Sequence, residues 1–159
     1  MTWTNICRAA FALAALILPS GAAHAGQIIR NDHGRCQAGN TAVLATVYGI
    51  KDLQGNIRVQ SYRATNSEWL QKGHWLSRID VPATAGVMRF CIPVETAGAY
   101  AIAVRHDRNG NGKTDIMRDG GGMSNNPAIS IWNLGKPSYN KVRVIVDGVT
   151  QITIRMRYM

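Results

Sequence analysis

Apolar and polar residues alternate with a period of two in several short stretches of this 159-residue chain, and turn-forming residues separate the stretches. Such alternation predicts half-buried β-strands at residues 41–50, 57–63 and 86–93. A turn signal at 52–56 lies between the first two, which are therefore expected to pair as a hairpin. Residues 99–104 also alternate between two faces, but both sets of side chains there are apolar. A strand with two buried faces is expected at the centre of a sheet.

The C-terminal segment has the clearest alternation in the chain. Valines occupy every second position from 142 to 146, and large apolar residues occupy every second position from 152 to 158. Both stretches predict strands with a polar outer face. The dipeptide Asp147–Gly148 predicts a hairpin turn between them. A longer loop or a bulge that places Val144 opposite Ile152 fits the apolar pattern better than a two-residue turn does.

Two further segments are less regular. Residues 64–80 mix tryptophan and leucine with polar residues, a pattern compatible with a short helix followed by a strand. Residues 120–127 are rich in glycine and asparagine and predict an irregular connection, with a brief strand at 128–132. No stretch shows sustained helical periodicity. The expected fold is therefore all-β, a single antiparallel β-sandwich of about seven strands.

The first 25 residues have the pattern of a signal peptide. Arg8 precedes an apolar run at 9–18, and Ala23–His24–Ala25 supplies the small residues that signal peptidase accepts. We expect cleavage before Gly26, which leaves one domain at 26–159. The apolar run is too short to span a bilayer. The mature chain is expected to lack a transmembrane segment and to be exported, either to the periplasm or out of the cell.

The cysteines agree with export. Cys7 would leave with the signal peptide, so that Cys36 and Cys91 remain. In an oxidising compartment this pair predicts a disulfide, which would contribute about 4 kcal/mol in a chain-entropy model because the loop it closes is long. The alternative is a pair of unrelated buried thiols.

The charge balance favours an anionic partner. One of the 18 Lys and Arg lies in residues 1–25, so 17 remain against 9 Asp and Glu, a net charge of +8. These cations are scattered singly, which disfavours nucleic acid and leaves an anionic envelope polymer or lipid as the candidate partner. If the tryptophans do not simply cover one end of the core, the candidate contact residues are Arg143, Arg155, Arg157, Trp69 and Trp75.

The segment YAIAVRHDRNGNGKTDIMRD at 100–119 leads from the expected central strand into a loop rich in aspartate, asparagine and glycine. Numbered from Asp107, the loop has oxygen-bearing side chains at positions 1, 3, 5 and 9 and glycine at position 6, as calcium loops do. Position 12 is Arg118 instead of a bidentate glutamate, so a modest affinity is expected. The candidate calcium ligands are Asp107, Asn109, Asn111, the carbonyl of Lys113, and Asp115.

The same loop also has an ion-free interpretation. Asn-Gly dipeptides relieve positive φ in tight turns, and asparagine side chains can bond their own backbone. A third interpretation is hydrolysis by His106 and Asp107, which would need an open pocket at this corner. Adjacent residues of a strand point to opposite faces, however, and no nucleophile motif or metal-binding histidine cluster accompanies the pair.

The segment YAIAVRHDRNGNGKTD, the glycine-rich stretch after it, the motif Ser124–Asn125–Asn126 and the closing strands up to Tyr158 resemble the bacterial DUF2141 family. The resemblance covers residues from about 43 to 158, and it implies an immunoglobulin-like or prealbumin-like β-sandwich without implying an activity. Members often carry Gly-x-Pro-x-Glu between the loop and S-N-N. Residues 118–123 of this chain are shorter and lack both that proline and an acidic residue after Asp119.

These features together predict an exported, non-enzymatic β-sandwich of unknown physiological role, with an Asp/Asn loop that is a candidate calcium site or an ion-free structured turn. A binding module for an anionic envelope polymer or lipid is the alternative, and a hydrolase at His106 and Asp107 is the third hypothesis.

Overall fold

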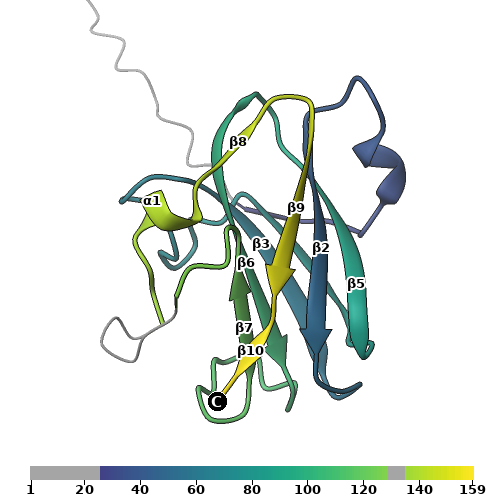
Figure 1. Cartoon of the computed structure of the whole chain (residues 1–159), viewed down its shortest axis with the longest axis vertical. Coiled ribbons are helices and arrows are strands. Elements are labelled where there is room, and N and C mark those ends of the chain that lie inside the picture. Colours follow the sequence, from purple (N-terminus) through teal and green to yellow (C-terminus); the bar gives the residue numbers. More distant parts are fainter. Residues whose placement is uncertain (1–25, 129–134) are drawn as a thin grey trace, which may run out of the picture.

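In the computed structural model, which describes residues 26–128 and 135–159, the chain forms two β-sheets (Figure 1). The described elements are β1 (Gln27–Ile28), η1 (His33–Cys36), β2 (Ala42–Ile50), β3 (Asn56–Arg63), β4 (Ser77–Pro82), β5 (Gly86–Pro93), β6 (Gly98–Asp107), β7 (Gly120–Met123), α1 (Tyr139–Val142), β8 (Val144–Val146), β9 (Val149–Arg155) and β10 (Arg157–Tyr158). The larger sheet has the order β1-β4-β3-β6-β7-β10, with β8 also paired to β6, and the smaller sheet has the order β5-β2-β9. Among the described residues, no helix is long and apolar enough to cross a membrane.

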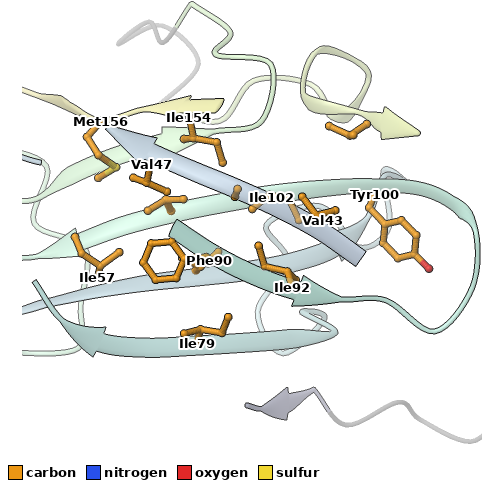
Figure 2. Close-up of a cluster of buried hydrophobic side chains, with 14 of the residues drawn as sticks. Val43, Val47, Ile57, Ile79, Phe90, Ile92, Tyr100, Ile102, Ile154 and Met156 are labelled. Carbon is orange, nitrogen blue, oxygen red and sulfur yellow. The ribbon is translucent and has the colours of Figure 1, made fainter. Parts of the chain in front are cut away.

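One hydrophobic core lies between the two sheets (Figure 2). Alternate residues of β2, β5 and β9 face alternate residues of β3, β4, β6 and β8 across it. The strands expected at 41–50, 57–63 and 86–93 are confirmed, with bounds that differ by at most one residue, and the strand expected at 99–104 is confirmed as part of the longer β6. Members of the core with almost no exposed surface include Val43, Val47, Ile57, Ile79, Phe90, Ile92, Ile102 and Ile154.

β6 is the central strand of the larger sheet, because it pairs with β3 along one edge and with β7 and β8 along the other. Its inward residues join the core, whereas Ala101 on the opposite face belongs to a second cluster. In that cluster, side chains of the turns at 64–76 and of α1 pack against the outer face of β3 and β6. Its buried members are Tyr62, Ala64, Trp69, Ala101 and Val142. Both faces of β6 are therefore buried, as its alternation predicted, and the alanines leave room for the covering layer.

Neither predicted hairpin forms. β2 pairs with β5 and β9, whereas β3 pairs with β4 and β6, so the turn at 52–56 connects the two sheets. The turn at Asp147–Gly148 also connects the sheets, because β8 pairs with β6 and β9 pairs with β2. Val144 consequently lies opposite Tyr100 instead of Ile152. Both predictions were wrong because alternation assigns a side chain to a face without identifying the neighbouring strand.

Three further expectations need correction. The sheets are mixed and not purely antiparallel, since β9 runs parallel to β2 and β1 runs parallel to β4. The described residues form ten strands instead of about seven, because β1, β8 and β10 are too short to show a period. Residues 64–76 form turns without a helix, with Leu70 at a φ of 54°. The brief strand expected at 128–132 lies outside the described residues except for its first position.

The glycines at 120–122 form β7 instead of an irregular connection. Gly120 and Gly122 face the C-terminal strand, which leaves the smaller sheet after β9 and joins the larger sheet as β10. A Cβ on Gly120 would lie 2.3 Å from the Tyr158 ring, and one on Gly122 would lie 2.7 Å from the Ile154 side chain. The absence of side chains at these two positions allows the crossing strand to approach β7 closely.

We predict that Gly120→Ala lowers the free energy of unfolding by about 1–3 kcal/mol, because the added methyl group overlaps the Tyr158 ring. Gly121→Ala is the matched control, since a Cβ there meets nothing within 4 Å. We expect the control to change the free energy by less than about 0.5 kcal/mol. Urea denaturation of both variants provides the measurement, and equal destabilisation would contradict the close approach of β10.

Candidate functional site

The Asp/Asn loop, residues 107–119, connects β6 to β7 and begins and ends with a buried aspartate. One oxygen of Asp107, Oδ2, accepts the backbone N–H of Gly112 at 2.8 Å. Asp119 accepts the backbone N–H of Arg108 at 3.2 Å through Oδ1 and that of Asp115 at 2.9 Å through Oδ2. Both carboxylates have little exposed surface, so they serve as fixed acceptors for the loop backbone. Asp119 was not among the candidate ligands, because it falls one position after the expected twelfth.

The exposed half of the loop is organised around Asp115. The side-chain amides of Asn109 and Asn111 both donate to Asp115 Oδ2, at 2.6 and 2.8 Å. Their own oxygens accept backbone N–H groups two residues further along the chain, from Asn111 at 3.2 Å and from Lys113 at 2.7 Å. The two amides hold the pKa of the Asp115 carboxyl below its usual range. In this arrangement amide nitrogens, and not amide oxygens, point at the ninth position of the loop.

A guanidinium from the protein itself lies against the loop. Arg105 donates to the hydroxyl of Thr114 at 3.0 Å and to the carbonyl of Gly112 at 2.9 Å. Its third contact is with Asp107 Oδ2, at 3.3 Å. Burial lowers the pKa of Arg105, and the neighbouring Arg58 lowers it further. The loop therefore already has a monovalent cation beside its first carboxylate.

One oxygen at this site lacks a partner. Asp107 Oδ1 is buried and accepts no hydrogen bond, and the Nε of Arg105 is buried without an acceptor. An unpaired buried polar atom costs roughly 1–3 kcal/mol, which a bound cation or water can offset. The five predicted ligands thus share one loop, but only Asn109, Asn111 and Asp115 are in mutual contact. Among the described residues, no group of three or more His, Cys, Asp or Glu is arranged to hold a metal ion.

His106 points into the molecule on the other side of β6 from Asp107, and it has no exposed surface. Its Nε2 lies 2.7 Å from the Gln54 carbonyl, so that nitrogen carries the hydrogen. In the neutral ring Nδ1 then accepts from the Tyr158 hydroxyl at 2.8 Å, and that hydroxyl accepts the Lys51 N–H at 3.1 Å. The imidazole therefore connects β6, β10 and the turn after β2. Both of its nitrogens are occupied by these contacts, which favours a structural role for it over hydrolysis.

An ion pair joins the same turn to the start of the loop. Asp52 Oδ2 accepts from the Nη2 of Arg108 at 2.5 Å and from its Nε at 2.9 Å. This hydrogen bonding lowers the pKa of Asp52, and it raises the pKa of Arg108. The backbone between these contacts is close-packed, since a Cβ on Gly55 would lie 1.9 Å from the Asp107 carbonyl oxygen.

The motif Ser124–Asn125–Asn126 connects three strands through side-chain hydrogen bonds. The buried Ser124 hydroxyl accepts the Ile102 N–H of β6 at 3.1 Å and donates to the Val142 carbonyl at 2.5 Å. Asn125 donates to the Arg143 carbonyl at 2.7 Å, immediately before β8. Asn126 bonds one edge of β9, since its amide donates to the Thr153 carbonyl at 2.9 Å and its oxygen accepts the Arg155 N–H at 2.7 Å. Both asparagines have positive φ, a conformation that asparagine tolerates better than most residues.

The five residues suggested for anion binding do not form one site, because the three arginines and the two tryptophans lie in different places. Arg143, Arg155 and Arg157 gather around the turn at 125–127, where the guanidinium of Arg157 donates to the carbonyls of Asn126 and Pro127. Trp69 is not exposed: it is buried, and its indole N–H donates to the Pro137 carbonyl at 2.8 Å. Trp75 is half-buried beneath the guanidinium of Arg78. Trp69 belongs to the cluster over β6, and Trp75 packs against that cluster. The alternative interpretation, in which the tryptophan covers the core, therefore applies to Trp69.

The predicted disulfide between Cys36 and Cys91 is confirmed. It joins η1 to β5, across 55 residues of sequence. Cys91 is fully buried, and Cys36 is partly covered.

We predict that Ser124→Ala lowers the free energy of unfolding by about 1–3 kcal/mol, because it leaves the buried Ile102 N–H and Val142 carbonyl without their partner. Ser138→Ala is the control, since that exposed hydroxyl makes no capping bond to α1. Chemical denaturation monitored by tryptophan fluorescence measures both. A Ser124→Ala variant as stable as the control would show that the hydrogen bonds of Ser124 contribute little to the stability of the fold.

A second prediction concerns pH. Because the folded-state pKa of Asp52 is lowered, its ion pair with Arg108 stabilises the protein above the unfolded-state pKa of about 4 and is lost as the pH falls through the folded-state value. Asp52→Asn should therefore make the decline in stability below about pH 4 shallower. Arg108→Gln should do the same, and the double variant should add nothing further. Urea midpoints between neutral and acidic pH test this, and additive effects would contradict it.

Comparison with known proteins identifies a family for this chain, but that family has no described activity. A family model described as an uncharacterised protein conserved in bacteria, DUF2141, matches residues 45–153. No curated protein and no solved structure matches the chain. The matched span begins in β2 and ends in β9, and it includes β6, the Asp/Asn loop, β7 and the S-N-N motif. With most of its length matched, including the residues that carry the resemblance, the chain belongs to the DUF2141 family.

Proposed function

We propose that this protein is an exported, non-enzymatic β-sandwich of the immunoglobulin-like or prealbumin-like class whose Asp/Asn loop binds calcium. The leader-like pattern of residues 1–25 supports export, and so does the Cys36–Cys91 disulfide, which is typical of oxidising compartments. Two sheets around one core are compatible with a sandwich of that class. The site in the proposal is the loop, because it contains the buried carboxylate with an unpaired oxygen.

The unpaired Oδ1 of Asp107 is the observation that carries the calcium proposal. Its partner oxygen is held by the N–H of Gly112, the glycine at the sixth position of the calcium pattern. The side chain is nearly covered, with 5% of its surface exposed, so water does not freely solvate the free oxygen. A divalent cation on Oδ1 would remove an unsatisfied acceptor and add a charge-assisted contact.

Calcium would compete with contacts that the loop makes on its own. Asn109 and Asn111 would have to turn their amide oxygens inward, which would break their donations to Asp115. The guanidinium of Arg105 would repel the ion or move away from Asp107. With Arg118 at position 12 as well, we expect a dissociation constant of about 10⁻⁴–10⁻³ M, as in extracellular calcium modules.

Thermal melting tests the proposal. At calcium concentrations about ten times the dissociation constant, linkage predicts about 1.4 kcal/mol of stabilisation over the same protein in chelator. Asp107→Asn should abolish the response, because it keeps an oxygen for Gly112 and removes the charge, whereas Asp147→Asn, an exposed carboxylate before β9, should preserve it. Calorimetric titration with calcium should follow the same order. A wild-type melt that is identical in calcium and chelator would refute the calcium proposal and leave the fold unaffected.

A further inference from the structure

In the described part of the chain, the outer face of the smaller sheet carries exposed side chains, whereas that of the larger sheet is partly covered by the Trp69 cluster. Alternation directs one set of side chains of β2, β5 and β9 into the core and the other set outward. Tyr48 is 38% exposed and Val87 is 58% exposed on this face. The strand registers place the outward residues in rows that cross all three strands, two of which are Val87–Tyr48–Arg155 and Arg89–Thr46–Thr153.

This face is basic and contains no carboxylate. A third row, Cys91–Leu44–Gln151, follows these two on the other side of Arg89, and none of the nine positions in the three rows is acidic. Two of the nine are exposed arginines, Arg89 and Arg155. Neither guanidinium forms an ion pair with a carboxylate of the described residues. On the outer face of the larger sheet, in contrast, Asp80 pairs with both Arg58 and Arg78. The smaller sheet therefore presents cationic groups that remain available for an external anion.

One end of the face is hollowed. The side chain of Asn31 bonds the open edge of β5, through the Arg89 carbonyl at 2.8 Å and the Cys91 N–H at 3.0 Å. The next turn, η1, lies beside β5 and β2, as Figure 1 shows, and the disulfide fixes it there. A hollow of about 400 Å³ between η1 and the sheet is lined by His33, Cys36, Leu44 and Arg89. This volume lies within the range of small-ligand sites.

The wall of the hollow does not cancel the charge of Arg89 by an ion pair. Asp32 is the acidic residue of that wall, and its Oδ1 accepts the Gly34 N–H at 3.0 Å at the start of η1. His33 and Arg35, which follow it, add donors and positive charge on the same segment. The hollow is thus lined by the guanidinium of Arg89, the imidazole of His33 and the apolar side chain of Leu44. The disulfide holds η1, which carries His33, against the sheet.

We propose that the outer face of the smaller sheet binds an acidic polysaccharide, with a carboxylate- or sulfate-bearing sugar in the hollow against Arg89. A guanidinium binds such groups bidentately. From the hollow the sugar chain crosses the threonine hydroxyls of the middle row toward Arg155, beside the exposed ring of Tyr48. Hydroxyls and an aromatic ring suit sugars, which present both hydrogen-bonding groups and apolar C–H surfaces.

The chemistry of the face favours a sugar polymer over a membrane. Interfacial membrane-binding surfaces combine many basic residues with a set of protruding large apolar side chains. Here the large apolar side chains exposed in these rows are a single pair, Tyr48 and Val87, and threonines separate the two arginines. The proposal uses no residue of the Asp/Asn loop, so it stands or falls independently of calcium binding.

Binding of oligogalacturonate of defined length, measured calorimetrically in the presence of chelator, tests the proposal. The methyl-esterified oligomer is the matched probe, because esterification removes the charge of each carboxylate and adds only a methyl group, and we expect it not to bind. Arg89→Gln should weaken binding of the charged oligomer about tenfold, the loss expected for one charge-assisted hydrogen bond. Lys72→Gln removes the same charge from an exposed turn over the other sheet and should weaken binding by less than about twofold.

A second variant tests the path along the sheet. Thr153→Glu places a carboxylate in the row of Arg89 and should weaken binding at least as much as Arg89→Gln. Equal losses in Arg89→Gln and Lys72→Gln would show that only net charge matters and would overturn the proposal. Binding to phosphatidylglycerol vesicles without binding to the oligomer would identify a membrane surface instead, and failure to bind either probe would also refute it. Melting temperatures near that of the wild type establish that the variants are folded.

Discussion

The end of β6 imposes the constraint on which much of the structure depends: two adjacent polar side chains, His106 and Asp107, are buried on opposite faces of one central strand. A buried imidazole and a buried carboxylate each need hydrogen-bonding partners. His106 obtains its partners from the turn after β2 and from Tyr158. Asp107 obtains its partner by folding the loop back onto Gly112. The two residues thus bring together segments that are distant in the sequence.

The segments that mark the family perform related structural tasks. The glycines of β7 let the C-terminal strand cross so closely that Tyr158 reaches His106. The S-N-N motif supplies side-chain hydrogen bonds to the backbone of β6, of the residue before β8 and of β9. Asp119 closes the Asp/Asn loop by holding the N–H groups of Arg108 and Asp115. Each of these residue types is required by geometry or by an unpaired backbone group, whether or not the loop holds an ion.

The two sheets differ in what their outer faces offer. The larger sheet is covered at one end by the Trp69 cluster, and its arginines at the other end share Asp80 or reach Asp107. The smaller sheet has three strands, no covering layer beyond η1, and arginines without carboxylate partners among the described residues.

The sequence by itself determined the all-β class, the existence of the central strand, the disulfide and the family, because alternation, cysteine number and a specific motif are local properties of the chain. It did not determine strand partners: the turns at 52–56 and Asp147–Gly148 looked like hairpins, and only packing around the shared core sends them between sheets. The loop spacing placed Asp107, Asn109, Asn111 and Asp115 together, but which atoms face inward depends on Arg105 and Asp119. Arg89 was overlooked for the same reason, since the absence of carboxylates beside it is a property of three strands brought together by the fold.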